Sequence, residues 1–331
     1  MIVDVHAHYV SPRVVATVQR EGERYGARVV EMQDGAPVIQ VGSQPTHRTL
    51  APGLDDLEQR QRVMADQGVE RQVLSPWLDM TGYSLPTEQG ALWAQLLNDS
   101  VAGDLVGMPP ERFAAAATVP LQDGRAAAAE LQRAVGTLGY RGVTINTNIA
   151  GGNLDNPALD PFWAAAQEAR TPIIIHPAFV VQSPRLAEYY FTNLLGNPFD
   201  TAIAAASMIF GGVCDRFPDL KVVLVHGGGD FPYQCGRLMH GWRVRPETPK
   251  YLTRPPTDYL RWFYYDTILY YGPALRYLAE AVGVERLMLG SDYPFDMCPE
   301  DPKGVVVDAG FAEPERARIW GDNCAAVFHL E

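Results

Sequence analysis

Five side chains of the kinds that bind metal ions lie at equivalent places relative to the predicted strands of this sequence. Each follows, directly or within a few residues, a short apolar run of the kind that forms a buried strand. They are His6, His8, His176, His226 and Asp292. His6 and His8 are two residues apart, so in extended backbone their imidazoles point to the same side and can face one ion.

Each of these residues also has an ordinary structural explanation. A lone histidine after a strand is usually a hydrogen-bonded structural residue, and Asp292 could cap the segment that follows it. Their joint arrangement favours a metal site, because imidazoles with one carboxylate are the ligand set that zinc and similar cations prefer.

The elements that must position these residues alternate along the chain. The predicted strands are Ile2–Val5, Gln72–Ser75, Ala114–Val119, Gly142–Ile145, Ile173–Ile175, Val222–Val225, Phe263–Tyr265 and Leu287–Leu289. Amphipathic stretches lie between them, among them Glu88–Leu105, Ala126–Thr137, Ala274–Val282 and Glu313–Val327. Eight strands alternating with helices predict an α/β fold, the (β/α)8 TIM barrel, whose active site lies at the carboxyl ends of the strands.

One segment interrupts this alternation. Residues 9–52 are too many for a simple connection, and two alternating runs, Val29–Met32 and Val38–Val41, predict a hairpin. We expect a small insertion over the barrel mouth, which also carries Arg48. A two-domain chain is the alternative, but no linker supports it, so we expect one barrel over residues 1–331.

Composition limits the partners. The 331 residues carry a formal net charge of −12 and no basic stripe, which argues against nucleic acid. The longest apolar stretch, Ala202–Val213, is too short to span a membrane. The four cysteines are far apart and form no CxxC pair, and the N-terminus begins with a strand rather than a signal peptide. We therefore expect a cytoplasmic protein. Its anionic ligands would bind to a metal ion or to a few arginines near the site.

Four motifs carry a resemblance to a known family. VDVHAH at the start, IHP after the fifth strand, VHGGGDFPYQCGR and LGSDYPF resemble the decarboxylases of the amidohydrolase superfamily, over nearly the whole chain. The resemblance implies one divalent metal, usually zinc with manganese as the alternative, bound by His6, His8, His176 and Asp292. It also implies that His226 and Asp292 take part in acid/base catalysis.

Two arginines are singled out by the resemblance as carboxylate binders. They are Arg48 in the insertion and Arg237 after the glycine loop, the latter supplied across a dimer interface, so a homodimer or higher homo-oligomer is implied. Guanidinium binds carboxylate in a bidentate manner, although most arginines only form surface salt bridges. Apolar and aromatic residues flank Arg237 and either form this interface or face their own barrel. They are Tyr233, Leu238, Met239, Trp242 and Tyr251.

Two further features bear on the expected number of metal ions and on the wall of the substrate pocket. Amidohydrolases with two metals carry a bridging lysine or glutamate on strand four, whereas this chain has Asn146-Thr147-Asn148, so we expect a single metal. The family carries a tryptophan after the fifth-strand His-Pro, whereas this chain has Ala178 and Phe179.

We therefore expect a metal-dependent, non-oxidative decarboxylase of a small unsaturated or aromatic carboxylate. The alternative within the superfamily is a hydrolase or hydratase that uses metal-bound hydroxide. A binding protein on a degenerate barrel is disfavoured because the ligands and the acid/base residue are all present.

Overall fold

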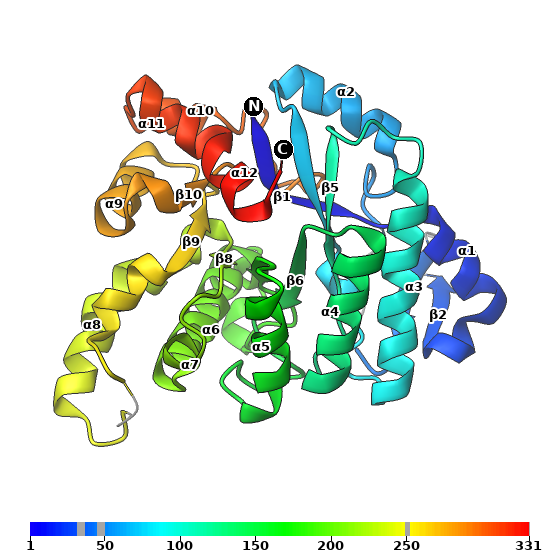
Figure 1. Ribbon diagram of the computed structural model, residues 1–331, viewed down its shortest axis with the longest axis horizontal. Helices are drawn as coiled ribbons and strands as arrows, with labels where there is room; N and C mark the ends of the chain where they lie inside the picture. The colour runs from blue at the N-terminus through cyan, green and yellow to red at the C-terminus, as the bar shows by residue number, and fades with distance from the viewer. Residues whose placement is uncertain (32–36, 45–49, 249–251, 331) are drawn as a thin grey trace.

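Eight parallel strands form the centre of the molecule in the computed structural model, which describes residues 1–31, 37–44, 50–248 and 252–330 (Figure 1). Their order in the sheet follows the chain, β1-β4-β5-β6-β7-β8-β9-β10. The strands are β1 (Val3–Tyr9), β4 (Arg71–Pro76), β5 (Phe113–Ala117), β6 (Gly142–Asn146), β7 (Ile173–His176), β8 (Val222–Leu224), β9 (Phe263–Asp266) and β10 (Leu287–Met288).

Helices surround this sheet, as Figure 1 shows for α3, α4 and α5. The α-helices are α1 (Pro12–Glu21), α2 (Leu57–Gln67), α3 (Thr87–Leu105), α4 (Gly124–Leu138), α5 (Asp160–Glu168), α6 (Asn197–Phe210), α7 (Val213–Arg216), α8 (Phe231–Val244), α9 (Gly272–Val282), α10 (Gly304–Asp308), α11 (Glu313–Ala317) and α12 (Asn323–Phe328). No helix in the described ranges is both long and apolar enough to cross a membrane.

The first and last strands join and make the sheet a barrel. Val5 N–H donates to the Leu289 carbonyl (2.9 Å), and His8 N–H donates to the Tyr293 carbonyl (2.8 Å). Ala7 also forms a parallel bridge with Tyr293. The carboxyl ends of all eight strands therefore open on one face.

Apolar packing holds the strands and helices together. One buried cluster includes Val5 of β1, Ile174 of β7 and Val223 of β8 together with Phe328 of α12. Runs such as Ile173–Ile175 are buried at every position, as expected for strands covered on both faces.

The predicted (β/α)8 class is confirmed, and every predicted strand overlaps an observed one. An antiparallel pair, β2 (Ala27–Glu31) and β3 (Pro37–Val41), lies where the hairpin was expected. Its placement over the barrel mouth stays a prediction.

The helix expected over Glu313–Val327 contains one π-helical turn, Arg318–Asp322. In this turn a β-carbon added to Gly321 would lie only 1.8 Å from the Met1 carbonyl oxygen, so glycine permits this close approach.

A buried arginine supports the carboxyl end of β1. Arg60 of α2 is fully buried and donates to the His8 carbonyl, to the Gly53 carbonyl (3.3 Å) and to Gln72 Oε1 (3.2 Å). Its guanidinium also lies 4.7 Å from the ring centre of Tyr293. Burial lowers the pKa of Arg60 to about 10, so it remains charged at neutral pH.

We predict that Arg60→Met lowers the free energy of unfolding by about 2–3 kcal/mol, because buried carbonyls lose a charged donor. Urea denaturation measures the effect. Arg62→Met, at an exposed position of the same helix, is the matched control and should change little. Equal stability of the two variants would contradict this role for Arg60.

Candidate metal centre and active site

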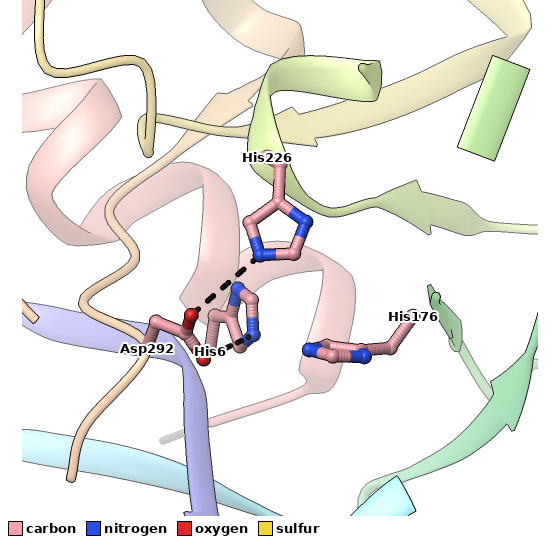
Figure 2. Close-up of side chains that lie close together, drawn as sticks. All are labelled: His6, His176, His226 and Asp292. Carbon is pink, nitrogen blue, oxygen red and sulfur yellow. Dashed lines mark ion pairs between the residues drawn. The ribbon is translucent and has the colours of Figure 1, made fainter. Parts of the chain in front are cut away.

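The structure brings all five sequence-predicted metal-type residues together at the carboxyl end of the barrel. His6 and His8 lie on β1, His176 is the last residue of β7, and His226 and Asp292 follow β8 and β10. Figure 2 shows the side chains of His6, His176, His226 and Asp292 converging from four different elements.

The ligand atoms are close enough to share one ion. The Nε2 atoms of His6 and His8 lie 3.3 Å and 3.2 Å from Asp292 Oδ1, and 3.1 Å from each other. His226 Nε2 lies 3.6 Å from Asp292 Oδ2. One ligand atom from each of His6, His176, His226 and Asp292 lies within 4.8 Å of the others.

Three atoms of this cluster are buried without a hydrogen-bond partner in the described part of the chain: His176 Nε2, Asp292 Oδ1 and His226 Nδ1. A buried polar atom that makes no hydrogen bond costs about 1–3 kcal/mol. The first two are acceptors when the imidazole is neutral and the carboxylate ionised. The donor set therefore fits a divalent cation.

The outer nitrogens of three histidines are held by the protein. Nδ1 contacts are His6 with Asp266 Oδ2 (2.7 Å), His8 with the Pro76 carbonyl (3.1 Å) and His176 with the Pro177 carbonyl (2.8 Å). The Pro76 and Pro177 carbonyls can only accept a hydrogen bond, so Nδ1 of His8 and of His176 carries the proton and Nε2 presents its lone pair to the centre. This is how metal-binding histidines are oriented.

Charges in the cluster also suit a cation. Burial lowers the pKa of His8 and, more strongly, that of His176, so both rings are neutral. Burial opposes ionisation of Asp292, but His6 and the other histidines hold its pKa well below the usual range. Burial likewise disfavours a charge on His6, yet Asp292 and Asp266 raise its pKa to about 10. His6 must therefore release a proton when a metal binds.

Two of these residues have unusual backbone conformations. His226 and Asp292 have φ values of 54° and 63°, in the left-handed region that side chains rarely occupy. Such strain is typical of functional sites. The glycines after His226 make its turn feasible, since a β-carbon on Gly229 would lie 2.1 Å from the Pro198 carbonyl oxygen.

Asp266, the last residue of β9, was not predicted as a site residue from the sequence. Its carboxylate is completely buried, contacts His6 Nδ1, and accepts hydrogen bonds from Gly227 N–H (2.8 Å) and Ile268 N–H (3.1 Å). It therefore couples His6 to the turn that holds His226. The available signal was an aspartate directly after the predicted strand Phe263–Tyr265.

A cavity of about 750 Å³ opens onto the cluster and is lined by His176, His226 and Asp292. A smaller cavity of about 300 Å³ also reaches His226 and Asp292. The larger volume suits a small organic ligand. Ala178 and Phe179, the residues that replace the family tryptophan, line its wall.

The two predicted arginines do not join the cluster in this chain. Arg237 is exposed on α8, and Arg48 lies outside the described residues. Within the described ranges, neither cavity is lined by lysine or arginine. A metal would thus be the main local positive charge for an anionic ligand.

Comparison with known proteins agrees with this architecture. The sequence profile of the amidohydrolase family matches residues 3–330. The chain belongs to the amidohydrolase family. The resemblance noted from its motifs is thereby confirmed.

Relatives within the family are named enzymes. The chain is 34% identical to 2-amino-3-carboxymuconate-6-semialdehyde decarboxylase of Dictyostelium discoideum over 80% of this chain and 74% of the relative. It is 25% identical to 2-keto-4-carboxy-3-hexenedioate hydratase of Sphingobium over 99% and 96%. The crystal structure of 5-carboxyvanillate decarboxylase from Sphingomonas paucimobilis superposes with a TM-score of 0.82 at 26% identity, covering 100% and 99% of the two chains.

We predict that purified protein binds about one divalent ion per chain, because the ligand atoms form one small cluster. Elemental analysis measures the stoichiometry. His176→Ala should lose most of the metal, whereas His240→Ala, at an exposed position of α8, should retain it. Two ions per chain, or full metal in His176→Ala, would contradict a mononuclear site at these ligands.

Proposed function

We propose that the protein is a metal-dependent, non-oxidative decarboxylase of an unsaturated or aromatic carboxylate. The observation that carries this proposal is the buried cluster of histidines and Asp292 at the floor of a small-molecule cavity. Named decarboxylases among the relatives support the reaction type.

In this proposal His6, His8, His176 and Asp292 hold one divalent ion, zinc or alternatively manganese. When bound, the ion supplies positive charge that binds the substrate carboxylate and an adjacent oxygen or nitrogen. Asp266 orients His6, and the Pro76 and Pro177 carbonyls orient His8 and His176.

His226 is positioned to move a proton. Its side chain lines both cavities, its Nε2 faces Asp292, and its Nδ1 has no partner within the described residues. When the bond to CO2 breaks, its electron pair stays on the substrate carbon. That carbon must gain a proton, which His226 would deliver. Asp292 beside it is ionised, so it would deliver a proton only after accepting one.

Hydration is the second candidate, because a hydratase is similar to the chain over 99% of its length. The same histidine would then take a proton from water while the oxygen adds to one carbon of a C=C bond, and the other carbon would receive a proton. The two reactions differ in whether carbon leaves the substrate.

Trapping of released CO2 distinguishes these functions. Metal-loaded protein is incubated with a panel of hydroxybenzoates and unsaturated dicarboxylates, with mass analysis of each product. Loss of 44 mass units together with trapped CO2 supports decarboxylation, and a gain of 18 supports hydration. Neither change with any compound would contradict both proposals.

We predict that His226→Asn retains the metal but lowers kcat by roughly 10²-fold or more, as expected for loss of a general acid/base. Metal analysis and steady-state kinetics on the active panel compound measure the two effects. The control is His329→Asn at an exposed position near the C-terminus, which should retain normal kcat. Loss of metal in His226→Asn would make His226 a ligand, and unchanged kcat would remove it from catalysis.

We also propose a homodimer in which Arg237 reaches the neighbouring active site and Arg48 binds substrate within its own chain. Arg237 is exposed, as such a role requires, and Tyr233 on the same helix is 78% exposed. Leu238 instead packs against the core of its own chain, so only part of this helix faces outward.

The free thiols of Cys214, Cys235, Cys298 and Cys324 support a reducing, cytoplasmic location.

Mixed dimers test the placement of Arg237. Arg237→Ala and His176→Ala should each be nearly inactive, but coexpressed together they should regain activity. The reason is that one site of the mixed dimer then has both an intact metal centre and an intact arginine. No recovery in verified mixed dimers would place Arg237 in its own subunit's site, and a monomer at assay concentration would contradict the interface.

A further inference from the structure

A polar pair lies on the side of the barrel opposite Asp292. Asn146 is the last residue of β6, the fourth strand of the sheet, whereas Asp292 follows β10, the eighth. In a closed eight-stranded barrel these positions face each other across the interior. Asn146 is paired in register with His176 and lines the same 750 Å³ cavity.

The side-chain amide of Asn146 has a defined orientation. Thr81 Oγ1 donates its only proton to the Leu78 carbonyl (2.9 Å), so this oxygen can only accept a further hydrogen bond. Asn146 Nδ2 is the donor, at 2.8 Å. The amide oxygen must therefore point away from Thr81.

That amide oxygen is an unused acceptor. Asn146 is only 1% exposed, and its Oδ1 has no hydrogen-bond partner among the described residues. Asn148, two residues later, differs because Nδ2 donates to the Ala178 carbonyl (3.1 Å) and Oδ1 accepts from Gly151 N–H (3.0 Å). The fold thus satisfies the hydrogen-bonding groups of Asn148 but leaves the amide oxygen of Asn146 without a partner.

A second unused polar group belongs to Tyr83. Tyr83 lines the same cavity and is almost fully buried, and its hydroxyl contacts the backbone of Asn146. Burial raises the pKa of Tyr83 above its ordinary value, so the hydroxyl keeps its proton at neutral pH. No acceptor for this proton lies within the described ranges.

We infer that Asn146 Oδ1 and the Tyr83 hydroxyl bind a hydroxyl group of the substrate, on the part of the molecule remote from the reacting carboxylate. A hydroxyl can donate to the amide oxygen and accept from the tyrosine at once, whereas a methyl group of similar size can do neither. This inference rests on the proposed function, since it places the carboxylate at the metal cluster. It makes Asn146 and Tyr83 determinants of specificity.

Calorimetric binding to metal-loaded protein tests the pair. The probes are six 2-hydroxybenzoates that carry either a hydroxyl or a methyl group at ring position 3, 4 or 5. At one position the hydroxyl compound should bind about 10- to 100-fold more tightly than its methyl partner, because the methyl leaves two buried polar groups unpaired. Asn146→Leu should abolish this preference and Tyr83→Phe should reduce it, whereas Asn153→Leu, at an exposed position, should retain it.

Equal affinity of hydroxyl and methyl probes at all three positions would overturn the inference, as would an unchanged preference in both variants or no binding of any probe. If Asn146→Leu fails to fold, the Tyr83→Phe variant and the comparison of probes on the wild-type protein still test whether the pair binds a hydroxyl group. Calorimetry needs no turnover. Absence of CO2 release would therefore contradict the decarboxylase proposal while leaving this binding result readable.

Discussion

The joining of the first strand to the last is the constraint on which the site depends. The Asp292 N–H donates to the His6 carbonyl (2.8 Å) at this seam, so two proposed ligands from opposite ends of the chain are hydrogen-bonded neighbours. Asp4 reinforces the seam by accepting from Ser291 Oγ (2.6 Å) and Ser291 N–H (3.1 Å). Closing the barrel thus brings Asp292 beside His6.

Buried charge in the site is compatible with this closed seam because the two carboxylates face a group of opposite charge. Asp266 and Asp292 are both nearly inaccessible, and each carboxylate faces His6. Two buried carboxylates around one imidazole favour a positive charge at this point, which a divalent cation provides more fully than a proton. In a chain of net charge −12, a cation bound here would concentrate the attraction for the proposed anionic substrate at the floor of the cavity.

Much of this arrangement could be predicted from the sequence because it depends on chain periodicity. The alternation of buried strands with helices predicted the barrel, and the strand ends predicted which residues would meet. Asp266 was not predicted because its role depends on contact with His6, 260 residues away in the chain. The Asn146–Tyr83 pair could likewise not be predicted from the sequence, since only the contact with Thr81 fixes the orientation of the Asn146 amide. Arg48 and Arg237 came from the family resemblance and stay predictions.

X-ray anomalous scattering from crystals of the metal-loaded protein locates the ion and identifies its ligands. We predict a single peak about 2.0–2.2 Å from His6 Nε2, His8 Nε2, His176 Nε2 and an Asp292 oxygen, with His226 too far to coordinate. Two peaks, a peak coordinated by His226 in place of His8, or a peak away from the seam between β1 and β10 would contradict it.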